Sequence, residues 1–419
     1  MYNRTLVIGF HRQDSTLFCD DVPLDVLAEA EGTPVYVYSA GLVRERTLAL
    51  QGALAGVPHA VHYALKANSN LAIVRLVRSL GCGADANSIG EVDVALRGGF
   101  RPADIVFTGV GKTRAELTRA VGLGLRSINA ESAGELARID ELARARGARA
   151  RVALRVNPDV DALSHPHIST GRRTNKFGVP LEDAAAICRS AARRPGLTIV
   201  GLHVHIGSQL AQLEPLREAI AGLVTLAREL RGAGVSIEHL DVGGGLGISY
   251  DGSAVPSIAD YAAVARSAVE GSDLTLLVEP GRALVGPAGA LVTEVVDVKR
   301  QSPDRLFVVL DAGMTELLRP ALYGAYHRIA PIIERSGTPI ACDFVGPLCE
   351  SSDVVAAGRS VPEPVVGDRF AVLDAGAYGF AMASNYNRRP LPAEVLVDGE
   401  TWRVVRRRQT IEHMLAPEL

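Results

Sequence analysis

The chain has 419 residues and a formal net charge of −3. Its length predicts two domains, and a charge so close to neutral excludes a protein that binds nucleic acid or an anionic membrane through a strongly basic surface. Five cysteines without a CxxC pair argue against a disulfide framework or a zinc site. The apolar run near the N-terminus is too short for a signal peptide or a membrane span, so we expect a cytoplasmic protein without a nucleic-acid or membrane partner.

From residue 61 to residue 279, short β-rich runs alternate with longer stretches of helical spacing. Eight strands are predicted in this region, within residues 61–66, 83–86, 105–109, 127–130, 152–157, 201–205, 239–242 and 274–279. Eight such β/α units over about 250 residues are typical of a TIM-type (β/α)8 barrel, which we assign to residues 31–283. An open doubly wound sheet is the alternative, but its phosphate-binding fingerprint is missing after the first strand.

The pattern changes after residue 283. Strand-like runs now follow one another without helices, at residues 291–298, 305–311, 342–345, 369–374 and 394–407. They predict a mostly antiparallel β domain, sandwich-like or barrel-like, formed by residues 284–419 together with residues 1–30. The predicted fold class is therefore α/β plus all-β.

The first chemical signal is Lys66, which closes the first predicted barrel strand in the sequence YALKANSN. Partial burial at the mouth of a barrel would lower the pKa of this amine and favour the neutral form that attacks carbonyl groups. A lysine that only caps the strand is the alternative.

The second signal is the run Gly243–Gly245 after the seventh predicted strand. Without side chains, the backbone N–H groups of such a run can surround an anion, although a flexible turn is the alternative. Ser208 could donate to the same anion, and His205 could lie over a planar ring. His203 and His205 would share one face of their strand, but no cluster of acidic or Cys ligands accompanies them in the sequence, so no metal site is predicted.

The third signal is Glu279, which closes the eighth predicted strand and is followed by Pro280-Gly281-Arg282. A carboxylate at this place can keep a pyridinium nitrogen protonated, and Arg282 could bind an anion with two hydrogen bonds. A simple ion pair between Glu279 and Arg282 is the alternative.

In this order the signals resemble the fold-type III, alanine-racemase-like decarboxylases that depend on pyridoxal 5′-phosphate (PLP), and among them the diaminopimelate decarboxylase family. The motifs that carry the resemblance run along nearly the whole chain: YALKANSN, HPHISTG, NKFG, HIGSQ, GGGLGISY, EPGR, RPALY, GPLCESSD and GAYGFAMASNYNRRPLPAEVLV. The resemblance implies a PLP-binding barrel and a β domain, and decarboxylation of meso-2,6-diaminopimelate at its D-centre to give L-lysine and CO2.

The resemblance also implies roles for single residues around the cofactor. Lys66 would hold PLP through a Schiff base, His205 would stack on its ring, and Glu279 would contact the pyridine nitrogen. Further residues would line the ring or surround the phosphate: Asp85, Arg155, Ser208, Gly243, Gly244, Gly245, Gly281, Arg282 and Tyr378.

On the substrate side, the resemblance assigns the distal carboxylate to Arg282, Arg319 and Tyr323, and Tyr378 is also expected to bind the substrate. Glu350 would bind the distal ammonium group, and Cys349 would return a proton to the substrate carbon after CO2 leaves. Family members place the last two residues in the active site of the neighbouring subunit, which implies a homodimer.

The chain departs from the family pattern at Ser352, where a glycine is usual, and in the run from Asp85 to Glu91. If residue 352 needs a positive φ, serine there costs on the order of 1 kcal/mol. Two other functions stay open from the sequence. One is a related fold-type III decarboxylase that acts on another free or carrier-tethered amino acid, and the other is a non-catalytic PLP-binding regulator.

Overall fold

The computed structural model describes residues 7–161, 170–302 and 305–419. The chain forms two compact units. The first contains Arg46–Ile248 and Ala254–Ala283, and the second contains the segment that ends at Glu45, Ser249–Ser253 and Leu284–Leu419. No helix in the described part of the chain is both long enough and apolar enough to cross a membrane.

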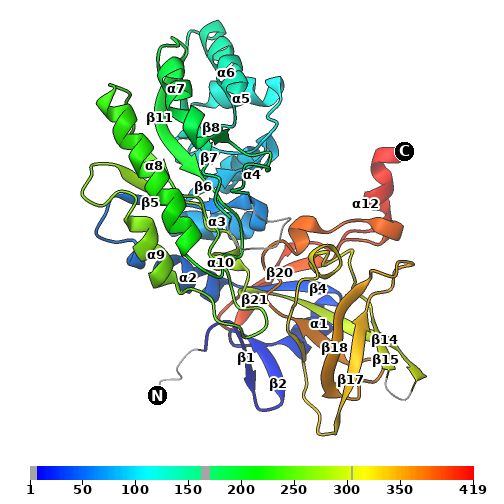
Figure 1. Cartoon of the computed structure of the whole chain (residues 1–419). Coiled ribbons are helices and arrows are strands. Elements are labelled where there is room, and N and C mark those ends of the chain that lie inside the picture. The colour runs from blue at the N-terminus through cyan, green and yellow to red at the C-terminus, as the bar shows by residue number, and fades with distance from the viewer. Residues whose placement is uncertain (1–6, 162–169, 303–304) are drawn as a thin grey trace. The chain divides into compact units, whose positions relative to one another are not determined.

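The first unit contains a closed parallel barrel (Figure 1). Its eight strands are β5 (His59–Ala64), β6 (Gly83–Ala86), β7 (Ile105–Phe107), β8 (Ser127–Ala130), β9 (Ala150–Asn157), β11 (Leu197–Val204), β12 (His239–Asp241) and β13 (Thr275–Val278). Each strand pairs in parallel with the next, and β13 pairs with β5, which closes the ring. The predicted TIM-type barrel is confirmed. A short additional strand, β10 (Val179–Pro180), pairs with the end of β9.

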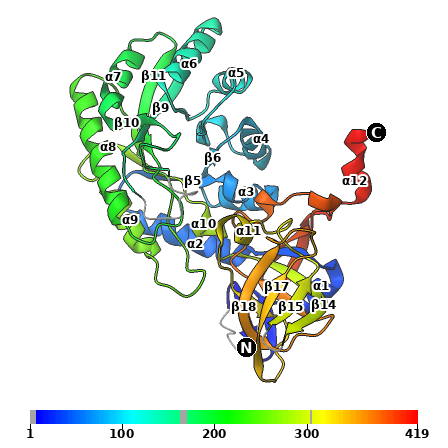
Figure 2. The same ribbon diagram turned by 45° about the vertical axis from the view of Figure 1, so that its right-hand side comes forward.

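Helices follow the strands and surround them, as Figure 2 shows from another side. They are α3 (Leu71–Ser79), α4 (Ile89–Gly98), α5 (Arg114–Leu123), α6 (Ala133–Ala145), α7 (Leu181–Ala192), α8 (Glu214–Gly232), α9 (Ile258–Arg266) and the short α10 (Arg282–Val285). Several of these helices begin at a hydroxyl side chain that accepts a backbone N–H bond of the first turn, as Ser88, Thr113, Ser132 and Ser257 do. In α8, buried residues recur every three or four positions, at Leu216, Ile220, Leu223, Ala227 and Leu230, so one face of the helix packs on the barrel.

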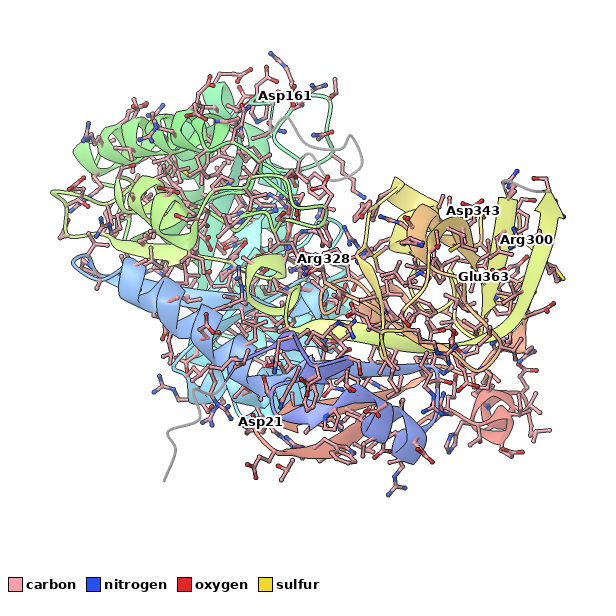
Figure 3. All side chains as sticks on the ribbon, turned by 90° about the horizontal axis from the view of Figure 1, so that it is seen from below. Asp21, Asp161, Arg300, Arg328, Asp343 and Glu363 are labelled. Carbon is pink, nitrogen blue, oxygen red and sulfur yellow. The ribbon has the colours of Figure 1, made fainter. Side chains whose placement is uncertain are left out.

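The second unit is built on a mostly antiparallel sheet, which confirms that prediction. Its strands are β4 (Val35–Ser39), β14 (Gly289–Ser302), β15 (Arg305–Leu310), β16 (Ile329–Pro331), β17 (Pro339–Val345), β18 (Val354–Pro362), β19 (Arg369–Val372), β20 (Ala393–Asp398) and β21 (Thr401–Arg406). The order is β18-β17-β15-β14-β4-β20-β21, and β19 pairs with both β14 and β16. The side chains of Arg300 on β14 and Glu363, which follows β18, form an ion pair of 2.6 Å (Figure 3).

The N-terminal segment adds a small antiparallel sheet of β1 (Phe10–Gln13), β2 (Thr16–Cys19) and β3 (Val22–Pro23), followed by α1 (Leu24–Glu31). Apolar side chains from this segment, such as Leu17 and Leu27, pack in one core with Val37 of β4 and Val292 of β14. The next helix is α2 (Ala40–Ala53). β4 (Val35–Ser39) pairs with β14 and β20, so it belongs to the sheet of the second unit. The sequence-based assignment had included this strand in the barrel range 31–283. The sequence-based domain boundaries stay a prediction.

The run 394–407 is a hairpin and not one strand. β20 and β21 pair in antiparallel fashion, with Asp398 opposite Thr401. Only Gly399 and Glu400 connect them, and Gly399 has φ +62°. Such two-residue turns need positive φ, which glycine adopts without a steric cost. The chain ends after the short helix α12 (Ile411–Leu415).

Candidate active site

The predicted barrel residues gather where the parallel strands end. Lys66 follows β5, Asp85 lies in β6, and His205 follows β11. The glycine loop follows β12, and Glu279 follows β13. Because all eight strands run in the same direction, these positions meet at the carboxyl end of the barrel, where enzymes of this fold carry their chemistry.

Lys66 lies just beyond its strand and not in it, which corrects the predicted strand end. β5 stops at Ala64, and residues Leu65–Ala67 form one 3-10 turn. The Lys66 ammonium nitrogen is 3.8 Å from Asp85 Oδ2 and 3.5 Å from Asn87 Oδ1, and 34% of its side chain is exposed. Asn70 caps the following helix α3, because its side chain accepts the Ala72 N–H bond. The lysine is therefore held between a strand end and a capped helix, with its amine accessible.

Below the lysine, Glu279 is buried at 4% exposure together with Asp85, which is fully buried. Burial and the neighbouring Glu279 charge raise the pKa of Asp85 to about 6. Burial also opposes ionisation of Glu279, but the charge and hydrogen bond of His203, together with the Lys66 charge, outweigh it and lower the Glu279 pKa well below its usual value. Glu279 is therefore expected to be an ionised carboxylate in a buried environment.

His203 and His205 have different surroundings. His203 Nε2 lies 3.3 Å from Glu279 Oε2, and possible ligand atoms of His203, Asp241 and Glu279 all lie within 4.8 Å of one another. The sequence-based statement that no acidic cluster accompanies these histidines was therefore wrong for His203, since Asp241 and Glu279 come from other strands. The prediction of no bound metal stays a prediction.

His205 is fixed by the glycine loop. Its Nδ1 accepts a hydrogen bond of 3.3 Å from the backbone N–H group of Gly244, which leaves the ring hydrogen on Nε2. Burial and the charges of Lys66 and Arg155 lower the pKa of His205 well below its usual value. The ring is therefore a neutral, oriented imidazole beside Lys66.

The loop Gly243–Gly245 needs glycine for steric reasons. Gly243 and Gly245 have φ of +69° and +101°. A Cβ atom on Gly244 would lie 2.2 Å from the Glu279 carbonyl oxygen, which no side chain tolerates. Next to this loop, the Arg282 guanidinium donates to the Ser208 hydroxyl at 2.9 Å. Hydroxyl, guanidinium and backbone amide donors beside a loop without side chains are suited to a phosphate group.

Gly281 and Arg155 complete the predicted barrel residues. A Cβ atom on Gly281 would lie 2.9 Å from Ala67 Cβ, so the chain passes close to the lysine turn. Arg155 is buried, and its Nη1 donates to Glu131 Oε1 at 2.8 Å. Glu131 was not among the predicted site residues, although its place directly after β8 was a usable signal.

The other predicted residues lie in the second unit. Arg319 and Tyr323 are on the short helix α11 (Arg319–Tyr323). Arg319 is buried, and its Nη1 donates to His327 Nε2 at 2.7 Å, while His327 Nδ1 donates to the Leu373 carbonyl oxygen at 2.8 Å. The guanidinium carbon also lies 4.6 Å from the centre of the Tyr250 ring. His327 and Tyr250 thus orient Arg319, and neither was among the predicted site residues.

Cys349 and Glu350 lie on an exposed turn between β17 and β18. Asp353 holds this turn together, since its carboxylate accepts the N–H groups of Leu348 at 2.9 Å and Met314 at 2.6 Å. Ser352 does not have a positive φ, so the expected strain does not arise. The substituted serine instead donates from its hydroxyl to the Met314 sulfur at 3.6 Å.

Tyr378 lies on the loop after β19 and has φ +58°, which is rare for a tyrosine. Such a conformation persists only where the surrounding structure imposes it, and it is frequent at ligand sites. Most of the HPHISTG motif, at 165–171, lies outside the described residues. Its Thr170 hydroxyl donates to the His205 carbonyl oxygen at 2.7 Å.

The comparisons with known proteins agree with this arrangement. The profile of the family described as "Pyridoxal-dependent decarboxylase, pyridoxal binding domain" matches residues 40–286. The diaminopimelate decarboxylase of Pseudomonas aeruginosa is 46% identical over 409 residues, which cover 98% of each chain.

The chain belongs to the diaminopimelate decarboxylase family. Solved structures agree. The Helicobacter pylori diaminopimelate decarboxylase complexed with L-lysine has a TM-score of 0.91 at 41% identity, covering 94% of this chain and 99% of that one. The M. jannaschii diaminopimelate decarboxylase has a TM-score of 0.93 at 36% identity, covering 98% of each chain.

The cofactor of the family is PLP, and the barrel residues fit it. Lys66 offers an accessible amine, and the glycine loop with Ser208 and Arg282 offers donors and space for a phosphate. The buried Glu279 carboxylate offers a partner for a protonated ring nitrogen. The residues needed at the two ends of the cofactor are therefore both present in one unit.

Proposed function

We propose that this protein decarboxylates meso-2,6-diaminopimelate at its D-centre and releases L-lysine and CO2, with PLP as cofactor. The observation that carries the choice of substrate is the full-length identity of 46% to a relative named diaminopimelate decarboxylase. The residues that the family resemblance assigns to the distal end of the substrate, Arg319, Tyr323 and Glu350, are all present.

Bound PLP supplies an electron sink for the electron pair that departing CO2 leaves on the substrate carbon. In the proposed assignment, Lys66 holds the cofactor through its amine, and His205 presents a neutral ring to it. Glu279 remains ionised and holds a proton on the pyridine nitrogen. Asp85 and Arg155 line the barrel below the ring.

The phosphate is proposed to bind among backbone and hydroxyl donors. These are Ser208, the amides of Gly243, Gly244, Gly245, Gly281 and Arg282, and the Tyr378 hydroxyl. Fixed backbone dipoles hold an anion without the side-chain entropy that a lysine cluster would lose.

The distal end of the substrate is proposed to contact Arg282, Arg319 and Tyr323 through its carboxylate, near Tyr378, and Glu350 through its ammonium group. Two guanidinium groups and a phenol suit a carboxylate and disfavour the bare ammonium end of ornithine or lysine. Cys349 would then deliver the proton that replaces CO2. The finer proposal is a homodimer in which Cys349 and Glu350 act in the active site of the partner subunit, and their exposure on the turn between β17 and β18 supports it.

The test compares the wild-type protein with Lys66→Ala and with Lys299→Ala, an exposed lysine on β14. After addition of PLP, the wild type and Lys299→Ala should show the absorbance of a lysine-bound cofactor and release CO2 and lysine from the meso isomer. The LL isomer, ornithine, arginine and glutamate should give no product. Lys66→Ala should lack both properties, and full turnover by this variant, or preference for another amino acid by the wild type, would refute the proposal.

A further inference from the structure

Two carboxyl groups lie side by side in the barrel interior, next to one histidine. Asp241 at the end of β12 and His203 on β11 are fully buried, and Glu279 nearly so. Burying two adjacent carboxylates is costly, because each loses its hydration and repels the other. One histidine side chain cannot compensate for both, and the two carboxyl groups differ in their hydrogen bonds.

The hydrogen-bond contacts of the Glu279 carboxyl group with His203 and Thr108 are those of an acceptor. Its Oε2 faces His203 Nε2 at 3.3 Å, and its Oε1 is 3.5 Å from the Thr108 hydroxyl oxygen. His203 Nε2 must carry a hydrogen atom to face a carboxylate at this distance. This geometry agrees with an ionised Glu279.

Asp241 is different, because only one of its two oxygens has a donor. Its Oδ1 accepts the Gly243 N–H group at 2.9 Å. Its Oδ2 is buried and has no donor among the described residues. A proton on Oδ2 removes this deficit, since it converts an unsatisfied acceptor into a donor toward Glu279. Burial, the Glu279 charge and the hydrogen bond between the two carboxyl groups all raise the pKa of Asp241 well above its usual value.

We propose that Asp241, as a neutral carboxylic acid, and His203, through its Nε2–H group, are positioning residues that hold Glu279 ionised and in one orientation. This inference rests on the proposed role of Glu279 toward the pyridine nitrogen. A carboxylate that keeps a ring nitrogen protonated must remain ionised and keep a fixed orientation. Hydrogen bonds from Asp241 and His203 to Glu279 meet both requirements.

Asp241 also links the two ends of the cofactor site. Its Oδ1 holds the Gly243 amide, and the Gly243 carbonyl oxygen accepts the Glu279 N–H group at 2.8 Å and the Tyr261 hydroxyl at 3.0 Å. The glycine loop and the Glu279 backbone are therefore fixed to the same acid. Loss of the Asp241 side chain should disturb both the phosphate loop and the carboxylate.

The first experiment uses the conservative and the truncating variant of the same residue. Asp241→Asn keeps an acceptor for Gly243 and replaces the acidic O–H by an amide N–H donor, so the Kd for PLP should stay within about threefold of the wild type. Asp241→Ala removes both bonds and should weaken PLP binding by about tenfold or more. If Asp241→Asn and Asp241→Ala raise the Kd for PLP equally, the inference is overturned, because a neutral amide cannot take the place of an ionised Asp241.

The second experiment observes the proton directly in the wild-type holoenzyme, so it does not depend on how a variant folds. Infrared spectra of protein with and without 13C-labelled aspartate are compared at about pH 8, above the pKa of Asp85, about 6, and of Glu91, about 7. We expect one aspartic acid C=O band that shifts with the label and is missing in Asp241→Asn. Absence of the band, or its persistence in that variant, would contradict the inference.

Glu279→Ala separates the inference from the proposed function on which it rests. If this variant leaves the cofactor absorbance and the Kd for PLP unchanged, the role assigned to Glu279 fails. If it changes both while Asp241→Asn and Asp241→Ala behave alike, only the inference fails. Zn²⁺ added to the protein without PLP should not bind stoichiometrically at Asp241. Stoichiometric Zn²⁺ binding that is lost in Asp241→Ala would contradict the inference, because it would show that His203, Asp241 and Glu279 form a metal site.

Discussion

At the scale of single residues, the proposed active site relies on side chains that other side chains hold in place. Lys66 is flanked by Asp85 and Asn87, and Arg155 is paired with Glu131. Fixing a charged side chain before the ligand arrives lowers the entropy that binding must overcome. The residues in contact with the proposed site residues are therefore as testable as the site residues themselves.

His327 is the clearest example. The His327 ring lies 5.1 Å from the Tyr250 ring, between centroids, so His327→Phe keeps a ring beside Tyr250 but removes the acceptor for the buried Arg319 guanidinium. We expect the KM for meso-diaminopimelate to rise by about tenfold and kcat to change little, because a buried donor without a partner costs roughly 1–3 kcal/mol and Arg319 would reorient. Steady-state kinetics at constant PLP occupancy measure this effect. An unchanged KM would show that His327 does not position Arg319 for the substrate.

His62 on β5 predicts a pH effect on stability. Burial, with the charge of Arg126, lowers its pKa to about 4. In the unfolded chain the same group titrates near 6.5, so between about pH 6.5 and pH 4 only the unfolded state binds the proton, and the folded state loses stability as the pH falls. His62→Gln should lack this loss, which amounts to roughly 3 kcal/mol. As the pH falls from about 6.5 to about 4, the Tm of the wild type should approach the Tm of His62→Gln. Parallel curves of Tm against pH for the two proteins would contradict the prediction.

At the scale of elements, the loops at the strand ends decide what the barrel can bind. The loop after β12 approaches Glu279 so closely that only glycine fits at position 244. Gly244→Ala should therefore raise the Kd for PLP by roughly 10- to 100-fold, because the loop or the Glu279 backbone must move away from the added methyl group.

A matched control for this loop variant is Gly52→Ala in α2, where a Cβ atom would meet nothing within 4 Å. In a helix, alanine is favoured over glycine, so this control should bind PLP like the wild type and be equally or more stable. Fluorescence titration with PLP and thermal unfolding distinguish the two variants. Equal PLP affinity in both would mean that the loop adapts without cost.

At the scale of the whole molecule, the proposed homodimer makes a prediction that no monomer could satisfy. Lys66→Ala and Cys349→Ala should each be inactive alone. After mixing and reassociation, about half of the dimers are mixed and each carries one intact site of two, so about a quarter of the wild-type activity should return. Activity assays after mild dissociation measure this recovery, and no recovery would place both residues in the same subunit's site.

Much of this molecule could be predicted from local sequence patterns. The eight barrel strands follow from short apolar runs between amphipathic stretches, since this periodicity depends only on neighbours along the chain. The same holds for Lys66, the glycine loop and Glu279, which come directly after strands. Prediction was weaker at element ends. The 3-10 turn at Lys66 and the hairpin inside 394–407 depend on backbone conformations at a few residues, which periodicity does not report.

Local sequence patterns are enough to identify the residues at the strand ends and therefore the chemistry that the barrel can carry. The partner of each buried polar group follows from the three-dimensional fold. His203 and Glu279 are 76 positions apart, yet they share a hydrogen bond because closure of the barrel brings β11 and β13 to the same interior. Such pairings follow from the register and closure of strands distant in the chain, and a one-dimensional pattern carries no information about them.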